Sequence, residues 1–514
     1  MADSINNSNS SKPVDHKPSV KFESLIWLIA AVMLIAGLGI RLYDLTDPPL
    51  DFHPTRQLRG AIIARSIYLD MQPDADPQQR EMAAFFAALT GKFEPPILET
   101  LVAITYRLIG SESFWVARIY SSLFWLAGGV FLFLLGRRMT GPAGGLVALG
   151  YYLFLPFAAQ ASRSFQPDPA MVMWLVIFIY ALYRWAEFHT WKWAVLCGAA
   201  GGLAILTKPV AVYIVAAGAV AVALHSLGLL QSLPRLQVWM MVILMAIPSV
   251  GYYFMLGRSN AGDYIANWTI ALSHMIIEPD FYVRWLSFVQ NWMGFSVMLL
   301  ALVGVIIAPP RNKALLCGLW AGYFIYGLTL PYQMYTHNYY HLQLVPILGL
   351  SLTTPAQILF ERFKEQSKLW KGVLAAGLLM AVIFQCWVAI ATLKAEDYRK
   401  EPAYWQKIST LLPADGKIIA LTQDYGYRLM YYGWRKVDLY PPSSEQELAE
   451  LRGREKDFVQ SFTKRIDDKD YFLVTAMGQL NNQPTLKKTL YDNYPLIAQG
   501  DGYLIFDLTH PKTP

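Results

Sequence analysis

The sequence predicts a polytopic α-helical membrane protein that ends in a small soluble α/β domain, and two observations carry this prediction. Of the 514 residues, 55% are hydrophobic and only 16% are charged, against about 25% charged in an average soluble protein. Charge is also unevenly distributed, because positions 395–514 hold 33 of the 80 Lys, Arg, Asp and Glu residues. This composition excludes a disordered chain, a fibrous protein and a wholly cytosolic enzyme. The net charge of +6 is modest and does not indicate nucleic acid binding.

Apolar segments long enough to cross a bilayer recur through the first three quarters of the chain. A spanning helix needs about 20 mostly apolar residues. We predict about eleven spans, at 25–43, 114–135, 143–160, 169–186, 192–206, 209–225, 237–256, 286–308, 314–330, 341–359 and 371–393. The 13-residue run 97–109 is interrupted by Glu99, so we predict a helix lying in the membrane interface there.

Basic residues in the short loops predict the orientation. With eleven spans and a cytoplasmic N-terminus, 14 Lys and Arg residues fall on the inner side and four on the outer side, as the positive-inside rule requires. Counting 97–109 as a span would reverse this bias. The sequence therefore predicts a disordered cytoplasmic tail (1–24), a transmembrane domain (25–394) with a long outer loop (44–113), and an extracytoplasmic α/β domain (395–514).

The extracytoplasmic domain alternates strand-like and helix-like runs, which is typical of a layered α/β domain. Strands are predicted at 417–421, 471–475 and 503–508, and helices at 403–412 and 445–464.

Ionisable side chains near membrane depth are costly and are treated as functional hypotheses, and here they collect at the outer ends of the spans. The segment PPLDFHPTRQLRG places Asp51 and His53 on one side of an extended stretch, followed by Arg56 and Arg59 on one helix face. Guanidinium groups bind phosphate bidentately, and a carboxylate can accept a hydroxyl proton. This pattern suits a general base beside a lipid phosphate. The alternative is a loop aspartate paired with an arginine that snorkels to the headgroups.

Three further segments present polar groups on the same side. Asp168 lies between two prolines where a helix begins, and a simple helix cap is the alternative role. Lys208 precedes a proline between two short spans and either faces a cavity or snorkels outward. The segment HNYYH is interpreted as a binding element, with an interfacial aromatic belt as the alternative. The remaining candidates for substrate binding are Glu94, Arg163, His337, Tyr339, Tyr340 and His341.

The order of these motifs resembles a known family. FEPP before the interfacial helix, SFWVARIYSSLFWLAGGVFLFLLGRRMTG, ASRSFQPD, GLAILTKP, HNYYHLQLVP and the trailing outer domain together resemble the GT-C superfamily of polyprenyl-phosphate-sugar-dependent glycosyltransferases. Within it, the chain is similar to the branch of protein O-mannosyltransferases and lipid A aminoarabinose transferases. The resemblance covers residues 25–360.

The resemblance implies an enzyme of the plasma (inner) membrane that takes a sugar from an undecaprenyl- or dolichyl-phosphate donor. It implies transfer with inversion, on the outer face, to a hydroxyl of a lipid, glycan or protein acceptor. Asp51 matches the acid taken as the base, and Asp168 matches the acid between the third and fourth spans. Lys208 falls in the Leu-Thr-Lys stretch, and Glu94 matches the glutamate of the Phe-Glu-Lys-Pro motif.

Two departures from the family pattern modify this expectation. Many relatives carry an acidic pair in the first loop, whereas here Phe52 and His53 follow Asp51, so His53 is a candidate to share the base or phosphate role. Pro95 stands where aminoarabinose transferases have a phosphate-binding lysine. Phosphate binding is then expected to shift to Arg56, Arg59 or Lys208, which argues against aminoarabinose as the sugar.

The family resemblance leaves cofactor use and alternative functions to be weighed. We expect no required metal, because positive side chains can hold the leaving phosphate; a divalent ion bridging Asp51 and Asp168 is the less favoured alternative. A polyprenyl-lipid transporter or flippase is the second hypothesis, although such proteins usually have repeated halves and broken spans that meet at the bilayer midplane. A non-catalytic scaffold is the third.

Overall fold

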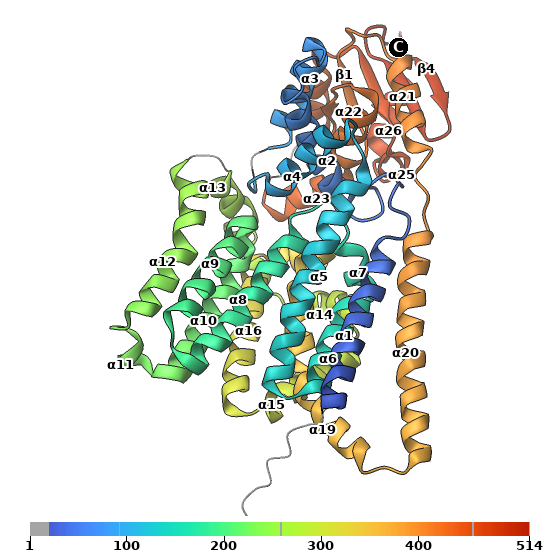
Figure 1. Cartoon of the computed structure of the whole chain (residues 1–514). Helices are drawn as coiled ribbons and strands as arrows, with labels where there is room; N and C mark the ends of the chain where they lie inside the picture. The colour runs from blue at the N-terminus through green and yellow to red at the C-terminus, as the bar shows by residue number, and fades with distance from the viewer. Residues whose placement is uncertain (1–19, 92, 257–259, 455–456, 513–514) are drawn as a thin grey trace, which may run out of the picture.

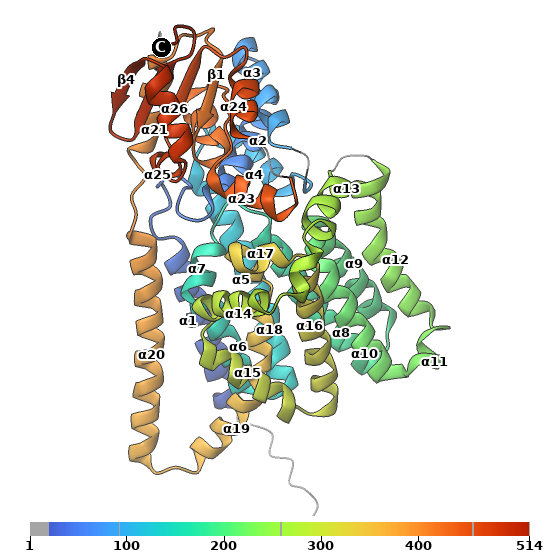
Figure 2. The same ribbon diagram turned by 180° about the vertical axis from the view of Figure 1, so that it is seen from behind.

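A helical bundle carries a small mixed sheet at one end (Figures 1 and 2). The computed structural model describes residues 20–91, 93–256, 260–454 and 457–512. Residues 1–19 of the predicted tail lie outside the described residues, and residues 20–24 already belong to the first helix. The helix begins at Val20, and its membrane-spanning part begins at Glu23, close to the predicted boundary.

Seven helical segments of the described chain are long and apolar enough to cross a membrane, or eight if one bent pair counts as a span. The predicted fold class, a polytopic α-helical membrane protein, is confirmed. The seven segments contain α1 (Val20–Arg41), α5 (Phe114–Met139), α8 (Asp168–Phe188), η1 (Pro209–Ala211) with α10 (Val212–Leu227), α12 (Leu236–Val250) with η2 (Gly251–Met255), η5 (Asn338–His341) with α18 (Leu344–Ser351) and α19 (Thr353–Lys364), and α20 (Lys368–Lys394).

Three other predicted spans lie in shorter or less apolar helices. These are α6 (Pro142–Phe154) with α7 (Pro156–Ala161), α9 (Trp191–Thr207) and α16 (Pro310–Thr329). The predicted span 143–160 is divided because Leu155 adopts an extended conformation before Pro156, as the residue before a proline commonly does. The other short elements of the bundle are α11 (Leu229–Ser232), α13 (Ala261–Tyr264), η3 (Ile265–Ile270), η4 (Ser273–Ile277) and α17 (Pro331–Thr336).

The predicted span 286–308 is sharply bent in the structure. The segment forms two helices, α14 (Pro279–Met293) and α15 (Phe295–Ile307), which meet at 97°. The break falls at Gly294, whose φ of 86° lies in a region that favours glycine. The buried residues of α14 recur at four-residue intervals from Phe281 to Met293, so one face of this helix packs against the bundle.

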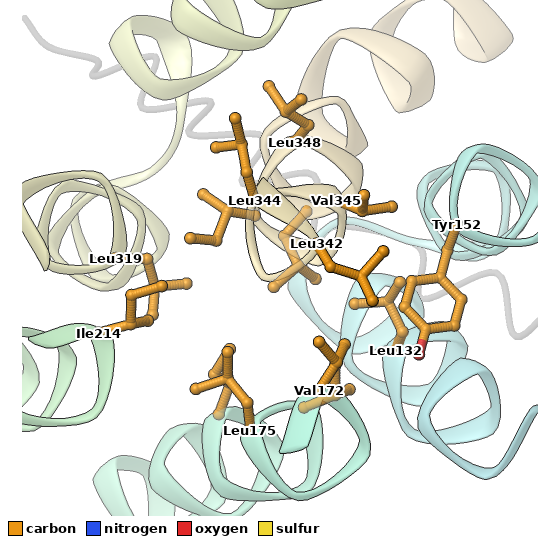
Figure 3. Packing of buried hydrophobic residues seen from close by; sticks show 14 of the residues in the cluster. Leu132, Tyr152, Val172, Leu175, Ile214, Leu319, Leu342, Leu344, Val345 and Leu348 are labelled. Atoms are coloured by element: carbon orange, nitrogen blue, oxygen red, sulfur yellow. The ribbon is translucent and has the colours of Figure 1, made fainter. Parts of the chain in front are cut away.

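The core of the bundle is built around α8. Fifteen of its 21 residues are buried. Figure 3 shows Val172 and Leu175 facing Leu342, just before α18, and Leu344, the first residue of α18. In contrast, α20 stands at the edge of the bundle (Figures 1 and 2) and buries only Ala389 and Leu393. A long apolar helix that is exposed on most of its surface is suited to contact with lipid.

Three helices of the long loop lie at the end of the bundle that carries the sheet (Figure 1). They are α2 (Pro54–Asp70), α3 (Pro77–Leu89) and α4 (Ile97–Ile109). The helix predicted at 97–109 is α4. Leu58 and Val102 of this loop share one hydrophobic cluster with Trp405 and Leu429 from the C-terminal region. The loop helices and the C-terminal region are therefore packed together.

The C-terminal region contains a five-stranded mixed sheet in the order β2-β1-β3-β5-β4. Strand β1 pairs in parallel with β2 and β3, whereas β5 runs antiparallel to β3 and β4. The three predicted strands are β1, β3 and β5. The predicted helix 445–464 is wrong as one element, because the chain leaves α23 near Gly453, whose φ is 65°, before α24 begins. The elements are α21 (Glu401–Leu411), β1 (Ile418–Leu421), η6 (Asp424–Gly426), α22 (Tyr427–Gly433), β2 (Asp438–Leu439), α23 (Ser443–Leu451), α24 (Phe458–Ile466), β3 (Tyr471–Val474), α25 (Met477–Asn481), α26 (Pro484–Asn493), β4 (Leu496–Gly500) and β5 (Tyr503–Asp507).

Candidate active site

Prolines position several candidate side chains at the ends of helices. Pro54 begins α2 directly after His53, whose φ of 47° is left-handed. Asp168 is the first residue of α8 and has a proline on each side. Lys208 ends α9 in an extended conformation because Pro209 follows it. Helix N-termini carry partial positive charge, so the first turns of α2 and α8 favour anions.

Lys208 and Asp168 form a buried ion pair. Lys208 Nζ lies 2.7 Å from Asp168 Oδ1, and the two side chains are 5% and 2% exposed. The ammonium also lies over the rings of Tyr339 and Tyr340, at 4.6 and 4.9 Å from their centroids, where the ring faces attract a cation. Asp168 Oδ2 is buried and accepts no hydrogen bond from the described residues. One acceptor at the centre of this cluster is therefore unused.

Two arginines of α2 converge on Glu94. Arg56 Nη2 donates to Glu94 Oε1 at 2.6 Å, and Arg59 Nη1 lies 3.5 Å from Glu94 Oε2. Arg59 also donates to the carbonyls of Thr90 and Gly91. Burial opposes the charged form of Glu94, but Arg56 and Arg59 outweigh it and lower its pKa to about 2. The carboxylate is thus ionised at neutral pH and fixes the two guanidinium groups.

Glu99 provides a test of the electrostatics next to this group. It is 7% exposed on α4, and burial raises its pKa to about 7 from 4.5. Between about pH 4.5 and 7 the folded protein keeps this proton, whereas the unfolded chain has released it. The free energy of unfolding therefore falls as pH rises through that window, by about 3 kcal/mol. We expect Glu99→Gln to remove this dependence. The Tm of the variant should rise relative to that of the wild type as the pH is raised from 5 to 8. A difference in Tm that stays constant over this range would contradict the expectation.

His53 and His337 lie side by side next to the ion pairs. Their rings are stacked with centroids 6.1 Å apart, and the His53 ring also packs edge-on against Tyr339 at 4.6 Å. His53 Nε2 donates to Asn338 Oδ1 at 2.6 Å. Burial lowers the pKa of His53 below its usual value, although the bond to Asn338 opposes this shift. The ring is therefore mainly neutral at neutral pH, with Nδ1 as an acceptor.

Asp51 is held in the loop before α2. Its Oδ1 accepts hydrogen bonds from Arg118 Nη2 and Gln57 Nε2, each at 3.1 Å. Arg118 is fully buried and also donates to the carbonyls of Asp44 and Leu45. Both bonds fall on Oδ1, and no described residue donates to Oδ2. The carboxylate is oriented and still has a free acceptor oxygen.

The structure brings most of the predicted site residues together, and it shows two others bound to backbone carbonyls. The group around the ion pairs contains His53, Arg56, Arg59, Glu94, Asp168, Lys208, His337, Tyr339 and Tyr340, with Asp51 in the adjoining loop. Arg163 instead donates to the backbone carbonyls of Tyr43 and Asp44. His341 is buried between the Tyr323 hydroxyl and the Met334 carbonyl. Both hold the fold around the site.

Sequence reasoning missed four residues of this region. Arg118 and Gln57 bind Asp51, Asn338 binds His53, and the Tyr264 hydroxyl lies 2.9 Å from that of Tyr340. Only Arg118 gave a clear signal, because a charged residue within a predicted span indicates a specific partner. The other three are ordinary polar residues whose partners are distant in sequence.

The fold and the polar cluster define a class: the chain is a multi-pass membrane protein with the GT-C fold. The comparisons with known proteins agree. The family model "Dolichyl-phosphate-mannose-protein mannosyltransferase" matches residues 93–252. A curated relative, the lipid A galacturonosyltransferase RgtD of Rhizobium johnstonii, is 26% identical over 131 residues, which are 26% of this chain and 28% of that protein. The match thus spans little more than a quarter of the relative.

Solved structures extend the similarity over almost the whole chain. ArnT from Cupriavidus metallidurans in the apo state has a TM-score of 0.58 at 16% identity, covering 95% of this chain and 98% of its own. The same protein bound to undecaprenyl phosphate gives 0.56 at 15%, with the same coverage. The archaeal oligosaccharyltransferase AglB from Archaeoglobus fulgidus gives 0.56 at 12%, covering 95% and 74%. The resemblance to GT-C glycosyltransferases that the motifs indicated is confirmed.

Proposed function

We propose that this chain transfers a sugar from a polyprenyl-phosphate-linked donor to an acceptor hydroxyl. The observation that carries this proposal is that Arg56 lies in the first turn of α2 and that Lys208 is paired with the first residue of α8, because helix N-termini with added cations form anion sites. The match to a mannosyltransferase model and the fold shared with ArnT, which has been solved with undecaprenyl phosphate, support it.

The donor phosphate would be bound by Arg56 and Lys208. A guanidinium has five N–H donors and an ammonium has three, whereas Arg56 uses one on Glu94 and Lys208 uses one on Asp168. Each therefore has donors left for phosphate. Arg59 supports the site indirectly by fixing Glu94. In this proposal, Arg56 and Lys208 take the phosphate-binding role of the family's lysine, because this chain has Pro95 at that position.

Asp51 is the proposed base. Its free Oδ2 would take the proton of the acceptor hydroxyl while the hydroxyl oxygen bonds to the anomeric carbon from the face opposite the phosphate. The bond between the anomeric carbon and the phosphate oxygen breaks, and the phosphate leaves with the electron pair, so the configuration inverts. Arg56 and Lys208 stabilise the charge that develops there. Neutral His53, whose Nε2 already donates to Asn338, has Nδ1 left to accept a hydrogen bond from a sugar hydroxyl.

We propose that transfer requires no metal ion. Both acids that could share one already have a cation, since Arg118 contacts Asp51 and Lys208 contacts Asp168. Among the described residues, no group of three or more His, Cys, Asp or Glu side chains is placed to hold a metal. A divalent ion bridging the two acids stays the less favoured alternative, and retained activity in EDTA would argue against it.

The proposed location is the outer face of the plasma (inner) membrane, with a cytoplasmic N-terminus. The excess of basic residues in the predicted inner loops supports this orientation. Helix α2, which carries part of the site, lies at the bundle end that carries the sheet, so the C-terminal region would stand on the side of the acceptor. The relative RgtD is named for lipid A, and the family model for protein acceptors; both kinds of acceptor belong in the test.

The direct test uses purified protein in liposomes with radiolabelled undecaprenyl-phosphate sugars and either lipid A or peptide acceptors. We expect label on an acceptor and release of undecaprenyl phosphate, with and without EDTA. Movement of intact donor across the bilayer without cleavage would favour the flippase. Neither cleavage nor movement, in protein that binds no donor, would favour the scaffold. Liposomes without protein give the background.

A further inference from the structure

The first turn of α2 carries functional groups that its own sequence does not stabilise. Proline is favoured at the first helical position, where Pro54 stands, but the N-cap residue, His53, makes no side-chain capping bond. Arg56 places a positive charge in the same turn, where the helix dipole favours a negative one. The turn that presents Arg56 to the proposed donor phosphate would therefore be stabilised by an anion supplied from elsewhere.

The C-terminal region supplies an anion at this turn. Thr55 Oγ1 donates to Asp424 Oδ1 at 2.9 Å. The other oxygen, Asp424 Oδ2, accepts from Arg428 Nε at 2.6 Å, and Arg428 Nη1 donates to Glu401 Oε2 at 3.1 Å. The carboxylate of Asp424 is thus fixed by α22 and α21 while it holds the beginning of α2.

The backbone is strained on both sides of this contact. Asp424 and Tyr425 have φ values of 51° and 55°, and His53 has 47°. Residues other than glycine adopt this region at an energetic cost and keep it only where the surroundings enforce it. The hydrogen bond between Thr55 and Asp424 therefore joins two strained turns, one in the loop before α2 and one in the C-terminal region. Strained backbone of this kind is common at functional sites.

A second link joins the C-terminal region to the opposite flank of the site. Arg452, just after α23, donates to the carbonyl of Asn267 at 3.1 Å, and its guanidinium lies over the Trp268 ring. The same segment carries Tyr264, whose hydroxyl contacts that of Tyr340 beside Lys208. The C-terminal region thus contacts the first turn of α2, which carries Arg56, and the segment 264–268, whose Tyr264 contacts Tyr340 beside Lys208.

We propose that Asp424 is a positioning residue for glycosyl transfer, acting through Thr55 to hold the first turn of α2. In this role the C-terminal region forms part of the framework of the site. The inference rests on the proposed function for its kinetic consequence, but the ordering of α2 can be measured without any transfer.

The test compares Thr55→Val, which removes the hydroxyl at nearly constant volume, with Thr55→Ser, which keeps it. We expect Thr55→Val to raise the donor KM about tenfold, to leave the acceptor KM unchanged, and to keep the Tm of the wild type. Thr55→Ser should restore the donor KM. Thr100→Val is the matched control, because Thr100 lies in the first turn of α4 and donates only to its own helix, at the Pro96 carbonyl. Adding Asp424→Asn to Thr55→Val should cause no further rise.

Hydrogen exchange of the amides at 55–58 separates this inference from the proposed function. Faster exchange in Thr55→Val, but not in Thr100→Val, supports the positioning role even if the wild type transfers no sugar, in which case the proposed function alone fails. Unchanged exchange together with an unchanged donor KM would overturn the positioning role. A rise in KM equal for the valine and serine variants would also overturn it.

Discussion

Replacing Asp51 with Asn is expected to lower sugar transfer by about 10²–10⁴-fold, the range typical for loss of a general base. Asparagine has nearly the same shape and can still accept hydrogen bonds from Arg118 and Gln57 through its amide oxygen. It cannot take the proton of the acceptor hydroxyl at neutral pH. The measurement is the initial rate of transfer from a radiolabelled donor, alongside thermal unfolding.

A matched control for Asp51→Asn is Glu112→Gln. Glu112 forms a comparable ion pair with Arg65 at 2.9 Å and accepts a hydrogen bond from Tyr431 of the C-terminal region. We expect this variant to lose some stability and to keep its rate of transfer. Near-normal activity in Asp51→Asn would remove Asp51 from the mechanism and would direct attention to Asp168, whose Oδ2 is unused.

The second large effect is expected at Lys208. Lys208→Met would leave the buried carboxylate of Asp168 without its partner, and breaking one side of a buried pair typically destabilises by about 3–5 kcal/mol. Transfer should also be lost, because a donor to the phosphate is gone. The double variant Lys208→Met with Asp168→Asn removes both charges, so its stability should recover.

The activity of that double variant shows whether the Lys208–Asp168 pair serves only folding or also sugar transfer. We expect it to fold and to remain inactive, as seen by thermal unfolding together with the transfer assay. An active double variant would make the pair purely structural. A single Lys208→Met variant as stable as the wild type would contradict the burial of the pair.

The spans were predictable because bilayer thickness imposes a local pattern that hydropathy captures. The bend between α14 and α15 was not, because it depends on the left-handed conformation of Gly294 within a continuous apolar run. Within the site, the location of charges at one end followed from topology. Their pairing did not: Lys208 and Asp168 are 40 residues apart, and Thr55 and Asp424 are 369 apart.

Arg163 and His341 illustrate the limit of reasoning from residue type. Both are polar residues at the mouth predicted from the sequence, yet both are buried and bound to backbone carbonyls. Whether a buried polar side chain faces a ligand or a carbonyl depends on loops such as 42–50, whose course the sequence pattern does not define. Arg118 shows the reverse case, a charge within a span whose partner is the proposed base.

The most direct measurement is a structure of the protein with a polyprenyl-phosphate sugar, or a non-hydrolysable analogue, in lipid nanodiscs. We expect the phosphate within hydrogen-bond distance, about 3 Å, of both Arg56 and Lys208, with the anomeric carbon between the phosphate and Asp51. A phosphate bound at the opposite end of the bundle, near Arg137 and Arg138, or one that leaves Asp51 on the same side as the leaving oxygen, would contradict the proposed site.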